Sequence, residues 1–158
     1  MSNGEKVAAT NRRARHDYAI EETYEAGMVL TGAEVKSLRN GKASLQESYA
    51  RVTDGEVWID NLHISPYSHA SQRQPDPRRS RKLLLHRKEI ERLVGKTQER
   101  GLTLVPMRIY FKRGMAKIEL GLGRGKRQYE KREAKLEKEH RREMERGFAR
   151  RQSGKDKG

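Results

Sequence analysis

Residues that could carry out catalysis or bind a metal are few in this sequence, and they are scattered. Of the five histidines, only His63 and His69 lie near each other, and they lack the i, i+4 spacing that places two metal ligands on one helix face. The absence of cysteine excludes disulfides, thiolate metal sites and cysteine nucleophiles. Gly121, Gly123 and Gly125 lack the apolar helix of a phosphate-binding loop, so we interpret them as a flexible segment. We therefore expect no catalytic residue, no metal, no cofactor and no enzymatic activity.

Basic residues gather in two segments whose chemistry suits the phosphates of nucleic acid. The first holds Arg12, Arg13 and Arg15. The second, a loop expected over residues 65–82, has only Asp76 to offset the repulsion among its cations, and binding to a polyanion would release counterions. The alternative, a solvated surface loop, remains open. The cations of this loop are Arg73, Arg78, Arg79, Arg81 and Lys82.

Aromatic residues that cannot pack in a core are candidates for stacking on bases. Tyr129 lies in a polar run, flanked by Lys126, Arg127, Lys131 and Arg132. An exposed ring among cations is what base stacking requires, and an exposed tyrosine without a role is the alternative. Aromatic residues at strand spacing are instead expected mostly in the core. These are Tyr18, Tyr24, Tyr49, Trp58, Tyr110 and Phe111.

Short strands and helices are expected to position these residues. Gly27 interrupts the first apolar alternation and indicates a bulge or a barrel corner. Thr31 and Glu34 have the spacing of a capping box, which begins a helix. Asp54-Gly55 suits the tight turn of a hairpin. The expected strands cover 18–30, 49–53, 56–59, 102–111 and 115–122, and the expected helices cover 31–40 and 87–100.

These elements predict a mainly β fold with added helices. The expected architecture is an OB-type closed β-barrel, a fold that often binds single strands or structured RNA. Three parts are expected: a flexible N-terminus at 1–11, an OB-fold RNA-binding domain at 12–122 and a basic C-terminal tail at 123–158.

The tail differs in composition from the rest of the chain. Residues 124–158 contain fourteen Lys/Arg and seven Asp/Glu, and only Leu136, Met144 and Phe148 could line an apolar face. Pairs such as Glu137 with Arg141 support a helix by only about 0.2–0.5 kcal/mol each. This is too little to order an isolated helix. We expect a tail that is disordered when free and helical when bound.

The whole chain carries a net charge of +14 over 158 residues. Such a charge favours a polyanionic partner, either nucleic acid or an anionic membrane surface. No apolar run approaches the roughly 20 residues that span a bilayer, and no signal-peptide pattern follows Met1. We expect a cytoplasmic protein that binds nucleic acid and no membrane.

Several motifs resemble those of the small protein B family, the tmRNA-binding (SsrA-binding) proteins of trans-translation. The opening motifs are Asn11-Arg-Arg-Ala-Arg-His16, Tyr24-Glu-Ala-Gly27 and Gly32-Ala-Glu-Val-Lys-Ser-Leu-Arg39. Arg81-Lys-Leu-Leu-Leu85 and Gly125-Lys-Arg-Gln-Tyr-Glu-Lys-Arg132 resemble the middle and tail motifs. The resemblance spans about residues 11–148. One difference is Glu130, where the family usually has Asp before Lys-Arg.

The resemblance implies a function at the ribosome and a set of site residues. The body would bind the tRNA-like domain of tmRNA and promote its loading into the A site of a stalled ribosome. The tail would occupy the empty mRNA channel beside 16S rRNA and become helical there. The family positions for tmRNA binding are Asn11, Glu25 and Leu84, to which the basic residues Arg12, Arg13, Arg15, Arg79, Arg81 and Lys82 are added. The tail positions are Gly125, Lys126, Arg127, Tyr129, Glu130, Lys131 and Arg132.

The resemblance also implies partners. They are tmRNA, the stalled ribosome and, through the alanyl-tmRNA complex, elongation factor Tu; the protein itself is expected to be a monomer. Composition alone fits two other hypotheses. One is a ribosomal protein with an rRNA-anchoring tail, and the other is a barrel whose basic loop binds an acidic protein.

Overall fold

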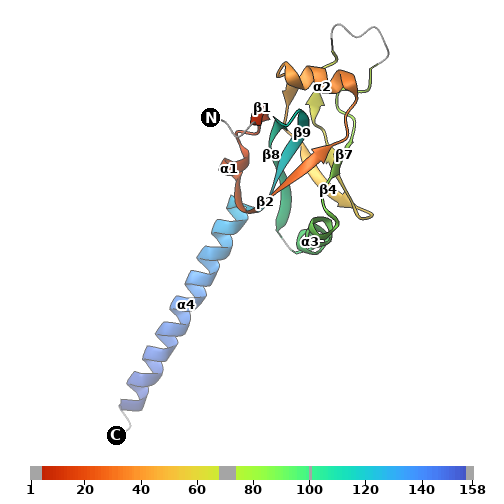
Figure 1. Ribbon diagram of the computed structural model, residues 1–158. Helices are drawn as coiled ribbons and strands as arrows, with labels where there is room; N and C mark the ends of the chain where they lie inside the picture. Colours follow the sequence, from red (N-terminus) through yellow and green to blue (C-terminus); the bar gives the residue numbers. More distant parts are fainter. Residues whose placement is uncertain (1–4, 68–73, 100, 156–158) are drawn as a thin grey trace.

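The computed structural model describes residues 5–67, 74–99 and 101–155, and a seven-stranded antiparallel sheet organises most of them (Figure 1). The strand order is β1-β8-β9-β2-β7-β5-β4, and a small second sheet pairs β3 with β6. The strands are β1 (Glu5–Thr10), β2 (Tyr18–Met28), β3 (Ala43–Ser44), β4 (Tyr49–Thr53), β5 (Glu56–Asp60), β6 (His63–Ile64), β7 (Arg81–Leu84), β8 (Leu102–Lys112) and β9 (Met115–Gly125). The helices are α1 (Ala14–Asp17), α2 (Gly32–Arg39), α3 (Arg87–Thr97) and α4 (Lys126–Lys155).

The mainly β fold with added helices is confirmed, whereas the closed barrel is not. The strands β1 and β4 are the edges of the sheet, and no backbone ladder joins them in the described ranges. One reason is that β1 takes up the second edge of β8 over residues 108–112. Most of the core is one large apolar cluster, in which Leu38 of α2 and Leu93 of α3 are fully buried. The two helices thus pack their apolar side chains into the same core as the strands.

Both tight turns place their central residues in the left-handed region. Asp54 and Gly55 have φ of 52° and 72°, and Arg113 and Gly114 have φ of 53° and 78°. Positive φ at both central residues is what a two-residue hairpin turn requires. The β4–β5 hairpin predicted from the sequence is therefore confirmed, and the second turn joins the strands expected over 102–111 and 115–122 as a β8–β9 hairpin.

The capping box of α2 is also confirmed. The Glu34 amide donates to Thr31 Oγ1 at 3.2 Å, and the Thr31 amide donates to Glu34 Oε1 at 2.9 Å. After α2, Gly41 has a φ of 68°, the conformation that a chain leaving a helix often adopts. These local signals fix where α2 begins and ends.

The structure corrects two predictions for the N-terminal part. Residues 5–10 form β1, paired with β8, in place of the flexible segment expected through residue 11. The bulge of β2 lies between Ile20 and Glu22. Gly27 keeps regular register with both neighbours, Leu84 on β7 and Lys117 on β9. A Cβ at Gly27 would lie 3.5 Å from Leu84, an ordinary van der Waals contact, so packing does not require a glycine here.

Gly121 and Gly123 near the end of β9 are tightly packed, and they do not form the flexible segment that we predicted. A Cβ at Gly123 would lie 2.4 Å from the carbonyl oxygen of Ala19, and one at Gly121 would lie 2.9 Å from Met107 Sδ. The ladder with β2 continues to the pair of Tyr18 with Gly125, three residues past the expected boundary at Leu122. Close approach of the β2 backbone explains the glycine at 123, and side chains of β2 and β8 occupy the space beside Gly121.

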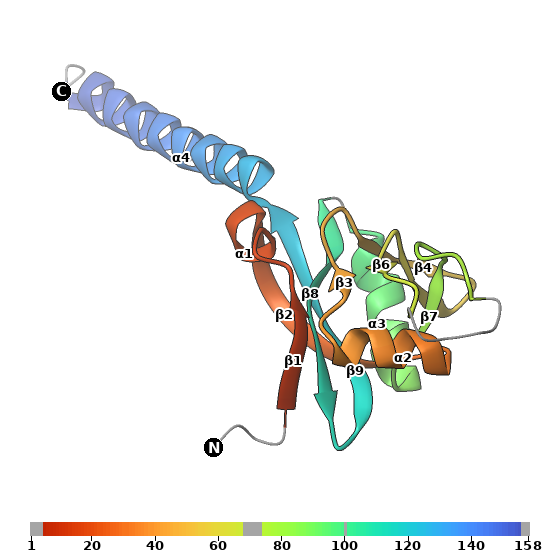
Figure 2. The same cartoon turned by 90° about the horizontal axis from the view of Figure 1, so that it is seen from above.

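The tail forms one helix, α4, which follows β9 directly and projects away from the sheet (Figures 1 and 2). Side chains are described for 126 and 134–148, and all of these are exposed. The sequence predicts disorder for the free tail, because no face can be buried; the structure instead has a helix, whose residues favour helix locally. No helix in the described part of the chain is long and apolar enough to cross a membrane.

Candidate nucleic-acid interface

The first predicted basic segment forms a short turn and α1 between β1 and β2. The Asn11 amide donates to the Met107 carbonyl at 2.8 Å, and Asn11 Nδ2 donates to the Pro106 carbonyl at 2.9 Å. Ala14 is buried in a small apolar cluster with Val105. Asn11 therefore fastens this segment to β8, and in doing so it fixes the position of the arginines beside it.

Arg12, Arg13 and Arg15 are exposed and make no ion pair with any residue that the structure describes. Most arginines and lysines on the sheet do have an acidic partner; Arg108, for example, lies 3.2 Å from both Glu5 and Glu119. Unpaired cations on a rigid segment are available to phosphates at little cost in ordering.

This segment adjoins the start of the tail, as Figure 2 shows for α1 and α4. The hydrogen bond from His16 lowers the pKa of Asp17, and the charges of Arg13 and Lys126 lower it further. The positive charge of α1 and the positive charge at the beginning of α4 therefore act on the same region. Gly125 is the last residue of β9 and Lys126 is the first of α4.

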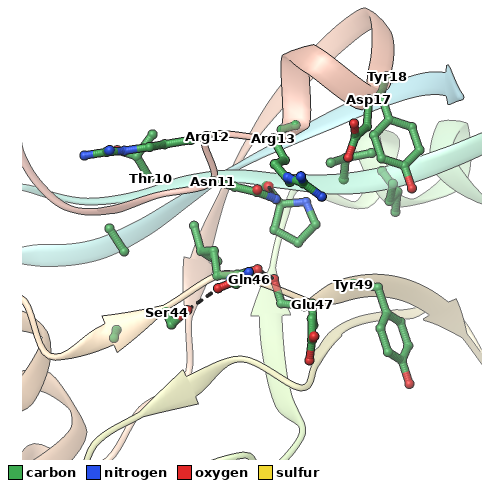
Figure 3. Close-up of a pocket in the computed structure, with 18 of the residues that line it drawn as sticks. Thr10, Asn11, Arg12, Arg13, Asp17, Tyr18, Ser44, Gln46, Glu47 and Tyr49 are labelled. Carbon is green, nitrogen blue, oxygen red and sulfur yellow. Dashed lines mark hydrogen bonds between the residues drawn. The ribbon is translucent and has the colours of Figure 1, made fainter. Parts of the chain in front are cut away.

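A cleft of about 630 Å³ opens beside this segment (Figure 3). One wall comes from residues 9–14 and 17–18, the opposite wall from residues 43–49, and β8 adds residues 103–106. Tyr49, expected in the core, is 55% exposed here. Sequence reasoning missed the cleft, because its walls come from three segments that no spacing rule connects.

The second group of predicted residues lies farther along the sheet. Glu25 follows Tyr18 by seven residues on β2, about 23 Å at 3.3 Å per residue. Glu25 accepts hydrogen bonds from Tyr110 Oη at 2.5 Å and from Lys112 Nζ at 3.5 Å. The bond from Tyr110, against a smaller opposing effect of burial, lowers the pKa of Glu25. This carboxylate is therefore charged and held in place.

Leu84 and Lys82 continue the same outer face of the sheet. Leu84 pairs with Gly27, which is two residues from Glu25 on β2 and so shares its face. Lys82, two residues before Leu84 on β7 and paired with Trp58, lies on this face as well. Leu84 is 53% exposed, and Lys82 Nζ lies 3.6 Å from Glu56. Glu25, Lys82 and Leu84 therefore lie on one face of the sheet.

Arg81 is not positioned to contact RNA, which corrects its predicted role. Its side chain is fully buried, and Nε donates to Glu34 Oε2 at 2.6 Å. The remaining nitrogens donate to the carbonyls of Leu62 at 2.6 Å and Pro77 at 3.0 Å. Arg79 Nη2 donates to the other Glu34 oxygen at 2.5 Å. A buried guanidinium requires an ion pair and hydrogen bonds of this kind, and Arg81 therefore has a structural role.

Glu34 links α2 to β7 through this network. Burial raises its pKa, but the hydrogen bonds from Arg79, the Thr31 amide and Arg81 outweigh burial and leave the pKa below its usual value. The same carboxylate thus caps α2 and forms ion pairs with two arginines on the β7 side. Of the second basic segment, Arg78, Arg79 and Lys82 keep some exposure.

Some predicted residues lie outside what the structure describes. Arg73 and His69 fall in the range 68–73. Arg127, Tyr129, Glu130, Lys131 and Arg132 lie within α4, but their side chains are not described. Their roles remain predictions. In the described ranges, no group of three or more His, Asp or Glu side chains is arranged to hold a metal ion.

Comparison with known proteins connects this chain to one family. A sequence model of the SmpB protein family matches residues 8–150. The SsrA-binding protein of Geobacillus thermodenitrificans is 56% identical over 153 residues, covering 96% of this chain and 99% of the relative. The SsrA-binding protein of Acidothermus cellulolyticus is 58% identical over 151 residues, covering 96% of this chain and 95% of the relative.

A solved structure, "tmRNA-SmpB: a journey to the center of the bacterial ribosome", is 60% identical with a TM-score of 0.62, covering 73% of this chain and 82% of that one. Sequence and structure agree in this assignment. The chain belongs to the SmpB protein family.

Proposed function

We propose that the chain binds tmRNA and brings it to stalled ribosomes in trans-translation. The observation that carries the proposal is the set of unpaired cations, Arg12, Arg13 and Arg15, which Asn11 anchors to β8. The relatives named SsrA-binding protein and the tmRNA-SmpB structure support tmRNA as the polyanion that these cations meet.

The body supplies two contact regions for the tRNA-like domain of tmRNA. The α1 segment contacts phosphates with its arginines, and the outer face of the sheet, with Glu25, Lys82 and Leu84, contacts a second part of the RNA. A spacing of about 23 Å between Tyr18 and Glu25 along β2 suits two contacts on one folded RNA. Two separated contacts favour a folded RNA over a single strand, because both must be met at once.

The tail acts on the ribosome. In this proposal α4 lies in the empty mRNA channel next to 16S rRNA, where Gly125, Lys126, Arg127, Tyr129, Glu130, Lys131 and Arg132 make contact. The helix buries no described face in the free protein, so RNA walls that supply counter-charge would stabilise it. Elongation factor Tu participates through the alanyl-tmRNA complex, and the protein acts as a monomer in the cytoplasm, where ribosomes are.

A binding experiment tests the proposal. The purified chain is titrated with tmRNA, a 16S rRNA fragment and duplex DNA at low and at physiological salt. All three polyanions bind at low salt through counterion release, and tmRNA alone keeps high affinity at physiological salt. Equal affinity for tmRNA and the rRNA fragment would favour a ribosomal protein, and no RNA binding would favour an acidic protein partner.

A further inference from the structure

The cleft beside α1 has a size and a construction that suit a ligand. Its volume of about 630 Å³ lies within the range of about 300–1,000 Å³ that is usual for small-molecule sites. Its lining includes Arg12 and Arg13, which the proposed function assigns to phosphates. None of the sequence motifs and none of the roles given above uses the opposite wall, residues 43–49.

That opposite wall is held in a defined conformation. The Gln46 amide donates to Ser44 Oγ at 3.2 Å, Ser48 Oγ donates to the Leu45 carbonyl at 2.6 Å, and Asn61 Nδ2 donates to the Glu47 carbonyl at 3.2 Å. Glu47 has a φ of 67°, an unfavourable conformation for a residue other than glycine. Strain of this kind persists where the surroundings enforce it, and it is common at binding sites.

The charges of the lining residues indicate whether the cleft suits the base or the phosphate of a nucleotide. The lining contains two arginines, Arg12 and Arg13, and two acids, Asp17 and Glu47, so its formal charges cancel. His16 Nδ1 lies 2.8 Å from the Asp17 carboxylate. A neutral group therefore fits the interior better than a phosphate. A phosphate suits Arg15, which is exposed and is not part of the lining.

We infer that the cleft binds the base of one unpaired RNA nucleotide. Figure 3 shows Arg13 extending into the space between the walls, with Gln46 across from it and Tyr18 at one end. A guanidinium or a tyrosine ring stacks on a base, and a glutamine amide donates to and accepts from a base edge. The inference rests on the proposed function, because it takes the nucleotide to belong to tmRNA.

Filling the cleft tests this inference. Gln46 is exposed, so Gln46→Trp should fold normally while its ring occupies the space of the base. We expect tmRNA affinity to fall about tenfold or more, the loss of one stacked base. Thr53→Trp is the matched control: Thr53 is exposed, neutral and outside the cleft lining, and its variant should bind as wild type. Wild-type affinity for Gln46→Trp with an unchanged melting temperature would overturn the inference.

A second measurement identifies the nucleotide. The chain has no cysteine, so Gln46→Cys provides a single point of attachment for an iron–EDTA hydroxyl-radical source. Cleavage of bound tmRNA should centre on an unpaired nucleotide, and Thr53→Cys should cleave elsewhere. Cleavage confined to base-paired nucleotides, or none from a variant that still binds, would overturn the inference.

The two proposals fail in distinguishable ways. If wild-type protein does not prefer tmRNA over the rRNA fragment, the proposed function fails. If wild type prefers tmRNA and Gln46→Trp binds it equally well, only the cleft inference fails.

Discussion

Individual charged residues in this protein divide into those that hold the fold and those that make no ion pair within the described part of the chain. Glu34 and Arg81 belong to the first kind, although both occur in motifs that identify the family. Arg12, Arg13 and Arg15 belong to the second. Sequence alone could not separate the two, because a buried arginine and an exposed one look alike until their partners are known.

Replacing Glu34 should show the cost of an uncompensated buried charge. Glu34→Gln leaves the guanidinium of Arg81 fully buried without its carboxylate. We expect a loss of about 3–5 kcal/mol in the free energy of unfolding, measured by urea denaturation. Arg78→Ala, at an exposed residue of the basic segment that also contains Arg81, should change the free energy of unfolding by less than about 0.5 kcal/mol. Equal small effects would show that the network is not structural.

The pair of Glu22 and Arg92 predicts a dependence of stability on pH. Hydrogen bonds from Arg92 and Tyr24 lower the pKa of Glu22 from 4.5 to about 2. A carboxyl whose pKa is lowered by folding stabilises the fold above its unfolded pKa, and this contribution is lost as pH falls from 4.5 towards 2.

We therefore expect the stability difference between wild type and Glu22→Gln to be largest near neutral pH and to shrink in acid. Urea denaturation at several pH values measures it, and added salt should reduce it, since Arg92 is 53% exposed. A difference that stays constant with pH would contradict this account.

At the scale of elements, the turns and the helix cap could be predicted from local sequence, whereas the pairing of distant strands could not. The hairpins and α2 were found because a turn or a cap is encoded within four adjacent residues. The pairing of β1 with β8, the open sheet and the cleft depend on segments about 100 residues apart, such as Glu5 opposite Lys112. No periodicity within either segment indicates that partner.

The glycines at the end of β9 test how that strand packs on β2. Gly123→Ala would place a Cβ 2.4 Å from the backbone oxygen of Ala19, which cannot move aside as a side chain could. We expect a loss of about 1–3 kcal/mol in the free energy of unfolding. Gly125→Ala, where a Cβ would meet nothing within 4 Å, is the control and should leave stability nearly unchanged. Similar stability of both variants would indicate the flexible segment predicted from sequence.

At the scale of the molecule, a packed body and an exposed basic helix meet at Gly125. The body buries one large apolar cluster, whereas the described side chains of α4 are all exposed. Composition predicted this division, because the apolar residues become sparse after residue 122. It placed the boundary three residues too early, since the β2–β9 ladder depends on backbone pairing that continues through glycines.

The division of labour between body and tail is the central claim of the proposed function, and one truncation tests it directly. A chain ending at Gly125 keeps the whole ladder and should fold. Its affinity for tmRNA and its ability to support tagging of peptides on ribosomes stalled on a truncated mRNA are measured beside those of the full chain. We predict tmRNA affinity comparable to that of the full chain at physiological salt and no tagging. Tagging at the full-length rate, or loss of tmRNA binding by a folded truncation, would contradict the account.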